Sequence, residues 1–179
     1  AILEASTQLE TWDEETGTEA YKAGIHTADP ITTDQAPDVL ARLLEPRWSA
    51  LMDGGHRVVV GLGGEHSVTL GPVRAVAAAF PDLAILHVDA HADVRAGFGG
   101  TEYGHGCIFR KIVDHAPVVQ VGIRSASPGE AEYLRGERRI KLLGEPILQA
   151  PAFAIILVPL RAIGRNLWLV RRHFAEDQF

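Results

Sequence analysis

Three side chains that can bind a divalent metal stand together in the stretch Asp-Ala-His-Ala-Asp at residues 89–93. It directly follows an apolar run, 84–88, whose composition predicts a buried parallel strand. Alternate side chains of an extended chain point the same way, so Asp89, His91 and Asp93 are expected to converge at the carboxyl end of this strand. Open α/β sheets bind ligands there, and carboxylates with an imidazole suit a divalent cation. The alternative is that the aspartates cap a helix and the histidine is solvated.

A second histidine with the same potential, His66, lies one strand–helix unit upstream in Gly-Gly-Glu-His-Ser at residues 63–67. The glycines allow a sharp turn and a close approach of the backbone. The turn follows a β-branched run, 57–62, that predicts another buried strand. We therefore expect His66 to reach the same sheet edge as Asp89, although a simple glycine turn with Ser67 as helix N-cap is the structural alternative.

Two more histidines and a cysteine are candidates for other roles. His105 lies in a glycine-rich loop that begins at the acidic cluster, so it is predicted to transfer protons or hold substrate there. The alternative is a solvated loop histidine. His87 lies inside the predicted strand and is expected to pack in the core. Cys107 lacks an evident base partner and is expected to be a small buried residue rather than a nucleophile.

The elements that must position these residues alternate between strand and helix. Strands are predicted over 57–62, 84–88 and 118–123. Such alternation is typical of an α/β fold with a mainly parallel sheet and helices on both faces. Helices are predicted over 9–15, over 38–52 with a possible break at Pro46, over 68–80, over 107–113, and from 128 onward.

Composition limits the classes of function. The 179 residues carry a net charge of -6 and no basic stripe, which argues against a nucleic-acid partner. Cys107 is the only cysteine, so an intrachain disulfide is impossible and a reducing compartment is expected. With no secretory signal pattern and no long apolar run, the chain is predicted to be cytoplasmic and without a membrane partner.

The last part of the chain differs in character. Residues 139–179 are predicted to be an atypical C-terminal segment beside a main domain of residues 1–138. Within it, an apolar run at 150–160 is bounded by prolines and is expected to be core filler or a misfit tail. His173, Glu176 and Asp177 are the further potential ligands there, but their spacing does not suggest a metal site.

In their order along the chain, these motifs resemble the ureohydrolase family of arginase, agmatinase and their relatives. Residues 63–67 look like its first metal motif, with Glu65 where the family usually has Asp, and residues 89–93 look like its second. Residues 103–106 resemble the segment that carries the active-site histidine, and residues 121–125 match the strand and turn that follow. Segments 9–13 and 23–26 look most like bacterial agmatinases, and the whole similarity covers about residues 1–135.

The resemblance implies an arginase-like three-layer αβα fold and two Mn²⁺ ions. By motif position His66, Asp89 and Asp93 would hold one ion, and His91 with the bridging Asp89 would hold the other. Hydroxide activated by this centre would attack a small cationic guanidinium substrate, with His105 assisting proton transfer. Agmatine would give putrescine and urea. The family often forms homo-oligomers.

The chain departs from the family in having no Ser-x-Asp-x-Asp motif, which supplies two further aspartate ligands. It therefore resembles a partial family fold, with three of four ligands for the first ion and two of four for the second. We expect weak or absent hydrolysis from this chain. The alternatives are a non-catalytic α/β domain that binds one metal ion or none, and a ureohydrolase for arginine, guanidinobutyrate or formiminoglutamate.

Overall fold

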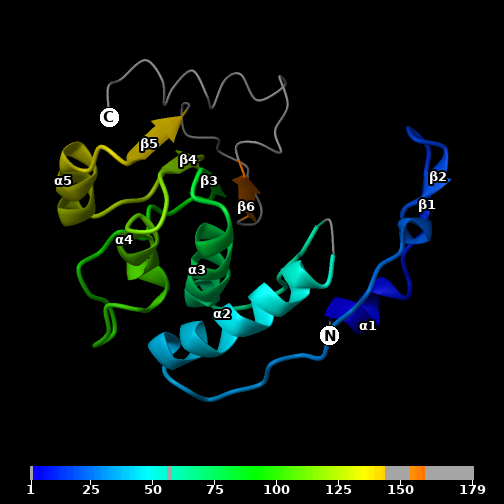
Figure 1. Ribbon diagram of the computed structural model, residues 1–179. Coiled ribbons are helices and arrows are strands. Elements are labelled where there is room, and N and C mark those ends of the chain that lie inside the picture. The colour runs from blue at the N-terminus through cyan, green and yellow to red at the C-terminus, as the bar shows by residue number, and fades with distance from the viewer. Residues whose placement is uncertain (1, 56–57, 144–153, 160–179) are drawn as a thin grey trace. The chain divides into compact units, whose positions relative to one another are not determined.

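The computed structural model describes residues 2–55, 58–143 and 154–159 (Figure 1). The chain forms two compact units, Ala1–Asp34 and Gln35–Phe179. The second unit carries every residue predicted for the site. Among the described residues, no helix has both the length and the apolar character that crossing a membrane would need.

The first unit holds a small hairpin where the sequence predicted a helix over 9–15. The Asp13 carboxylate accepts hydrogen bonds from the backbone N–H groups of Glu15 and Thr16, at 2.9 and 3.1 Å. Gly17 then turns the chain with a φ of +63°. The helix prediction is wrong because these side-chain bonds stabilise a turn in place of a helix. The elements of this unit are α1 (Ile2–Ser6), β1 (Trp12–Asp13), β2 (Thr18–Glu19) and η1 (Ala20–Ala23).

A four-stranded sheet in the order β5-β4-β3-β6 organises the second unit. The first three strands are parallel, with Ile85 opposite Val118 and Val118 opposite Ile140. The fourth strand runs antiparallel along β3. The predicted strands at 84–88 and 118–123 and the mainly parallel α/β sheet are thereby confirmed. The strands are β3 (Leu83–Val88), β4 (Val118–Val121), β5 (Ile140–Leu143) and β6 (Ala154–Pro159).

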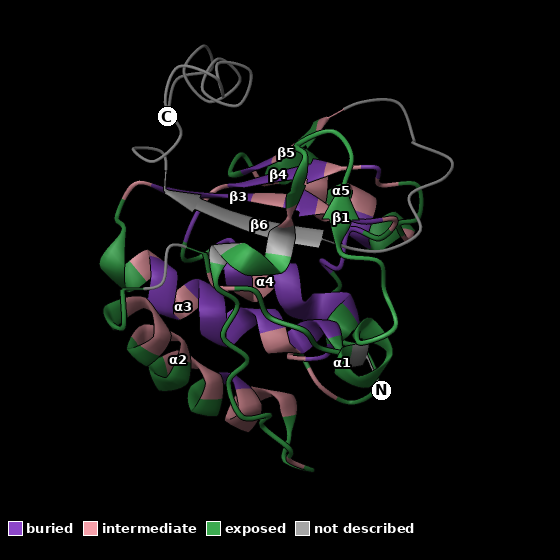
Figure 2. Ribbon diagram, turned by 90° about the vertical axis from the view of Figure 1, so that its right-hand side faces the viewer, coloured by how far each residue is buried: buried purple, intermediate pink, exposed green. Residues whose placement is uncertain are grey.

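Helices α2 and α3 cover the sheet as two successive layers, with α3 between the sheet and α2 (Figure 2). Gly71 permits their close approach, because a Cβ there would come within 2.6 Å of the Ala41 carbonyl oxygen and of Leu44 Cβ. Helix α2 continues through Pro46 without the predicted break. The helices are α2 (Pro37–Asp53), η2 (His66–Thr69), α3 (Leu70–Ala79), η3 (His105–Cys107), α4 (Ile108–Ile112) and α5 (Pro128–Gly136).

The hydrophobic core lies where α3 and α4 meet the inner strands. Each large apolar side chain buried here contributes about 1.5–3 kcal/mol of transfer free energy, which holds the strand ends that carry the site. The largest buried members are Leu70, Val73, Ile85, Ile108, Phe109, Ile112 and Val118.

The segment 58–62, which leads toward His66, is not the buried strand that the sequence predicted. Val58, Val60 and Leu62 are 77%, 73% and 62% exposed, and the segment has no strand assignment. A β-branched run becomes a strand only when a neighbour accepts its hydrogen bonds and covers its side chains. No strand within the described part of the chain pairs with this segment, so the prediction fails for lack of a partner.

The structure describes only part of the C-terminal segment, so it tests only some of the predictions made there. Strand β5 continues the parallel sheet past residue 138, and residues 154–159 of the apolar run form β6. The remainder of the segment, with His173, Glu176 and Asp177, lies outside the described residues. The domain boundary after residue 138 stays a prediction.

Candidate metal centre

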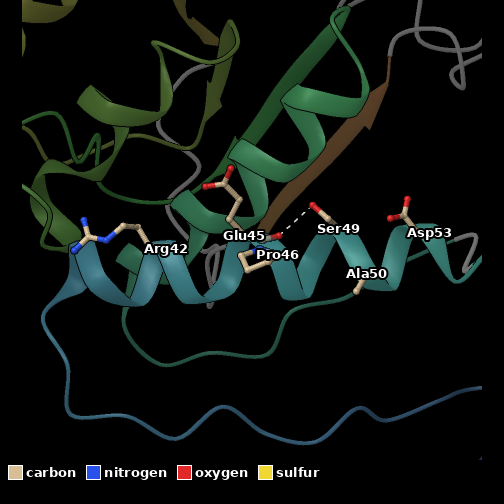
Figure 3. Close-up of a pocket in the computed structure, with 6 residues that line it drawn as sticks. All are labelled: Arg42, Glu45, Pro46, Ser49, Ala50 and Asp53. Carbon is tan, nitrogen blue, oxygen red and sulfur yellow. Dashed lines mark hydrogen bonds between the residues drawn. The ribbon is translucent and has the colours of Figure 1, made fainter.

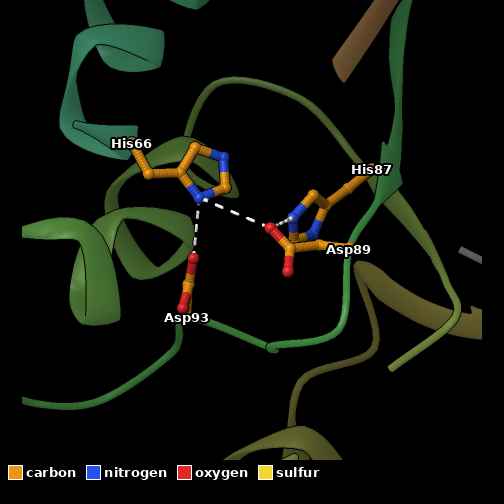
Figure 4. Close-up of side chains that lie close together, drawn as sticks. All are labelled: His66, His87, Asp89 and Asp93. Carbon is orange, nitrogen blue, oxygen red and sulfur yellow. Dashed lines mark hydrogen bonds and ion pairs between the residues drawn. The ribbon is translucent and has the colours of Figure 1, made fainter. Parts of the chain in front are cut away.

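Four buried side chains converge just beyond the end of β3: His66, His87, Asp89 and Asp93 (Figure 4). One possible ligand atom from each lies within 4.8 Å of all the others. His66 opens η2, and the other three come from β3 and the loop after it. Three of the four are residues that the sequence predicted as metal ligands.

The position of His66 depends on the residue before it. Glu65 acts as N-cap of η2, and its side chain accepts a hydrogen bond of 2.7 Å from the backbone N–H of Ser67. Gly63 lets the chain pass closely, because a Cβ there would come within 2.9 Å of a Val68 methyl group. The expected glycine turn is present, but Glu65 rather than Ser67 is the cap. This turn places His66 inside the molecule at 5% exposure.

Asp89 and Asp93 are held by the backbone around them. The Asp89 N–H donates to the Val121 carbonyl oxygen at 3.1 Å, which continues the β3–β4 pairing beyond the strand. Gly122 has a φ of +86°, and a Cβ on it would come within 3.2 Å of the Asp89 carbonyl oxygen. Asp93 has a φ of 55°, the only positive value at a non-glycine residue among those described. A positive φ is uncommon outside glycine, although aspartate adopts it more readily than most residues.

The distances within the cluster suit a small divalent cation. His66 Nδ1 lies 2.7 Å from Asp93 Oδ2 and 3.7 Å from Asp89 Oδ2. An ion held at about 2.0–2.4 Å from each ligand separates the ligand atoms by roughly 3–5 Å, so small adjustments would admit one. Buried carboxylates facing imidazoles form a donor set that suits a divalent metal ion.

His87 also belongs to this cluster, although the sequence predicted only a core residue there. Its ring is fully buried and stacks on Phe109, with ring centroids 3.8 Å apart, as expected of a core residue. Its Nε2 also lies 3.4 Å from Asp89 Oδ2. The alternation that grouped Asp89 with His91 and Asp93 reaches His87 when it is extended two residues back, so the pattern was present in the sequence.

Electrostatics favours the ionic states that bind a cation. Burial alone would raise the pKa of Asp89, but the His87 side chain and the His91 backbone N–H outweigh it and lower the pKa to about 2. Burial lowers the pKa of His87 despite the neighbouring aspartates. At neutral pH the carboxylate of Asp89 is therefore ionised and the imidazole of His87 is neutral.

His91 faces the other oxygen of Asp89. Its backbone N–H donates to Asp89 Oδ1 at 2.8 Å, and its Nδ1 lies 3.4 Å from the same atom. Its side chain is 63% exposed and is not one of the four clustered residues. The two oxygens of Asp89 thus face different histidines, which is the arrangement a bridging carboxylate needs.

His105 is connected to the first motif through Glu65. The backbone N–H and the ring Nδ1 of His105 lie 2.8 and 2.9 Å from Glu65 Oε1. The ring also packs edge-on against Phe98, with centroids 5.1 Å apart. Burial would raise the pKa of Glu65, but the Ser67 and His105 donors lower it. The structure therefore joins the segments around residues 65 and 105, with His105 outside the four-residue cluster.

Cys107 is a buried residue, as predicted. It is fully shielded from solvent, and its Sγ lies 3.8 Å from the Thr101 carbonyl oxygen. Burial raises the pKa of the thiol, so the reactive thiolate is disfavoured.

A comparison with known proteins identifies the family of this chain. The model of the Arginase family matches residues 1–144 of the chain. The chain belongs to the arginase family.

Named members of the arginase family are similar over most of this chain. An N(1)-aminopropylagmatine ureohydrolase from Thermus thermophilus is 40% identical over 172 residues, 94% of this chain and 57% of the relative. Another from a Synechocystis species is 33% identical over 144 residues, 75% of this chain and 46% of the relative. The crystal structure of agmatine ureohydrolase of Thermoplasma volcanium matches with a TM-score of 0.67 at 30% identity, covering 79% of this chain and 47% of that one.

These matches confirm the predicted family and the arginase-like α/β fold. The chain spans about half the length of the arginase-family relatives it matches. The family match ends at residue 144, and the domain boundary after residue 138 stays a prediction. The roles of His66, Asp89, His91, Asp93 and His105 stay predictions, with the geometry above as their support.

A hollow on the surface of α2 is separate from the metal cluster (Figure 3). It carries two carboxylates and one guanidinium but no imidazole and no thiol, and none of its residues belongs to the metal cluster. We assign it no function. Its lining residues are Arg42, Glu45, Pro46, Ser49, Ala50 and Asp53.

Proposed function

We propose that this protein is a ureohydrolase that hydrolyses a guanidinium C–N bond in a small linear cationic substrate. The observation that carries the proposal is the buried cluster of His66, Asp89 and Asp93 in an arginase-family chain. A buried cluster of acids and imidazoles is costly unless its charges are compensated, and a bound divalent cation compensates them.

The residues divide between two proposed Mn²⁺ ions. His66, Asp89 Oδ2 and Asp93 would hold one ion, since these atoms already face one another. His91 and Asp89 Oδ1 would contribute to the second, since they lie on the other side of the same carboxylate. When bound, such ions lower the pKa of a coordinated water molecule and offset the charge that develops during attack on the guanidinium carbon.

His105 is proposed to move a proton. Glu65 Oε1 accepts hydrogen bonds, so a proton on His105 Nδ1 satisfies the 2.9 Å contact between them. Its Nε2 is then the nitrogen that exchanges a proton with the leaving amine. Glu65 would thus set the tautomer of His105 as well as cap the turn that carries His66.

We propose agmatine as the substrate. Water and agmatine would give urea and putrescine, with the proton from water ending on the amine. The Thermoplasma volcanium structure is named for agmatine, whereas the Thermus and Synechocystis relatives are named for N(1)-aminopropylagmatine. Both compounds carry a guanidinium on a short apolar chain, so N(1)-aminopropylagmatine is the second candidate.

Urea release tests the proposal directly. The 179-residue chain is incubated with Mn²⁺ and with agmatine, N(1)-aminopropylagmatine or arginine in parallel. We expect slow release from agmatine, well below the ordinary range of about 1–10³ s⁻¹, because the described residues supply three ligands to one proposed ion and two to the other.

The matched controls are Asp89→Asn and Asp114→Asn. The first removes the shared carboxylate and should abolish release, whereas the second changes an exposed carboxylate and should leave it unchanged. Equal rates for the two variants would contradict the proposed site, and ordinary turnover by the parent chain would contradict the proposal of an impaired one.

A non-catalytic domain that binds a single metal ion is the second candidate function. It is favoured by the exposure of His91, which leaves the second position without the enclosure found around His66. Metal content per chain after equilibration with Mn²⁺ separates the two, since two ions support the hydrolase and one supports the binding domain.

A further inference from the structure

A chain of buried contacts leads from the sheet into the metal cluster. The side-chain amide nitrogen of Gln120, on β4, lies 2.8 Å from the Ala92 carbonyl oxygen and 3.0 Å from His87 Nδ1. Gln120 and His87 are opposite each other in the β3–β4 pairing, and both are fully buried. The contacts therefore connect backbone, amide and imidazole without solvent.

The Ala92 carbonyl determines how the amide is oriented. A carbonyl oxygen only accepts hydrogen bonds, so the Gln120 atom 2.8 Å away must be the amide nitrogen. The reverse orientation would put two acceptor oxygens against each other in a buried site. The same nitrogen uses its second hydrogen to face His87 Nδ1.

This orientation determines the tautomer of His87. A donor at 3.0 Å requires Nδ1 to be the acceptor, so the ring proton resides on Nε2. That nitrogen has no hydrogen-bond partner among the described residues, and it lies 3.4 Å from Asp89 Oδ2 (Figure 4). Because the Gln120 donor occupies Nδ1, the ring cannot move this proton to its other nitrogen, so Nε2 keeps it and has no lone pair to offer a cation.

We propose that His87 is a positioning residue for Asp89 and not a metal ligand, and that Gln120 sets the tautomer on which this depends. The Nε2–H of His87 faces one oxygen of Asp89 and favours the position at which that oxygen meets the ion. Stacking on Phe109 keeps the imidazole in place. The effect on metal binding rests on the proposed function, whereas the tautomer does not.

The tautomer can be measured in the metal-free chain. In a protein labelled with ¹⁵N at histidine, we expect His87 to show a proton-bearing Nε2 and an unprotonated Nδ1. The Nε2–H signal should persist when Cd²⁺, a diamagnetic probe, is added. A proton on Nδ1, or loss of the Nε2–H signal when Cd²⁺ binds, would overturn the proposal.

Two variants of Gln120 extend the test. Gln120→Glu replaces the donor by an acceptor and should move the His87 proton to Nδ1. Gln120→Leu removes the donor, and we expect it to mix the tautomers and weaken Mn²⁺ binding about tenfold, the scale of outer contacts to metal ligands. Val119→Ala, a buried change on the same strand, serves as the control and should alter neither readout. An unchanged tautomer in both Gln120 variants would overturn the assignment.

The two proposals fail in different ways. A parent chain with the Nε2–H tautomer that binds no Mn²⁺ would overturn the proposed function and support the tautomer. A chain that binds Mn²⁺ with the proton on Nδ1 would do the reverse.

Discussion

Two short apolar runs lead into the candidate centre, and they differ in almost every structural respect. Strand β3 lies between β4 and β6, and Ile85 within it is 1% exposed. The segment 58–62 is richer in β-branched residues, yet Val60 is 73% exposed and the segment is not a strand. Strand formation here follows the availability of a neighbour and not the residues of the run itself.

The difference divides the site into two differently supported halves. Asp89 and His87 are positioned by a paired strand, whereas His66 is positioned by a capped turn after an unpaired segment. The hydrogen bond between His66 Nδ1 and Asp93 Oδ2 joins the halves. Substitutions in the two runs therefore test most directly whether the two halves of the site are supported differently.

The largest expected difference is between Ile85→Ala and Val60→Ala. Removing the buried side chain of Ile85 should lower the free energy of unfolding by about 2–5 kcal/mol, because it leaves a cavity in the core. Removing the exposed methyl groups of Val60 should change it by less than about 0.5 kcal/mol. Urea unfolding of both variants measures this, and similar losses would show that 58–62 is packed in solution.

Asp89→Asn tests the paired half through metal binding. The carboxylate faces histidines with both oxygens, so its loss should weaken Mn²⁺ binding at least 100-fold, about 2.7 kcal/mol. Titration calorimetry on the parent chain and the variant gives the ratio. Val60→Ala is the control from the other half, and binding should survive it unchanged. If Asp89→Asn bound Mn²⁺ as the parent does, the centre would lie elsewhere.

Lowering the pH should change the stability of the folded state through the metal cluster. The exposed segment 58–62 should not contribute, because it has no ionisable side chain. The pKa of Asp89 falls from 3.8 to about 2 on folding, so its ionised form stabilises the folded state. That contribution, about 2 kcal/mol, is complete above pH 4 and is lost as the pH falls toward 2. Unfolding of the metal-free chain at several pH values measures the loss, and Asp89→Asn should remove this part of the dependence. An unchanged dependence in the variant would exclude Asp89 as its source.

The smallest effect concerns Glu65, at the end of the unpaired half. Glu65→Ala removes the cap of η2 and the acceptor for His105, and should lower the free energy of unfolding by about 1 kcal/mol. Glu65→Gln keeps an acceptor oxygen, so it should lower the free energy of unfolding by less. Thermal unfolding of both variants checks the order, and equal losses of stability would show that only the charge of Glu65 matters.

The sequence predicted the elements whose packing and pairing partners are also present in the fold. The strand at 84–88 and the helix at 38–52 were found because neighbours complete them, and the alternation after residue 88 placed Asp89 correctly. The two failures have different causes. The run 58–62 lacks a paired strand among the described residues, and Asp13 diverts the chain into a hairpin through side-chain bonds.

Within the site, the role of His87 could not be predicted from the spacing of residues. A histidine in an apolar strand is as consistent with packing as with chemistry, and His87 both stacks on Phe109 and lies beside Asp89. The contact with Gln120 that separates these roles crosses from one strand to the next. No spacing along a single run could reveal it.

The contact between His66 and Asp93 has a consequence for folding. These residues are 27 positions apart, and α3 lies entirely between them. An ion held by both would act as a reversible cross-link, which closes this loop as a disulfide would and removes chain entropy from the unfolded ensemble. Metal binding would then stabilise α3, a helix that contributes no ligand to the ion.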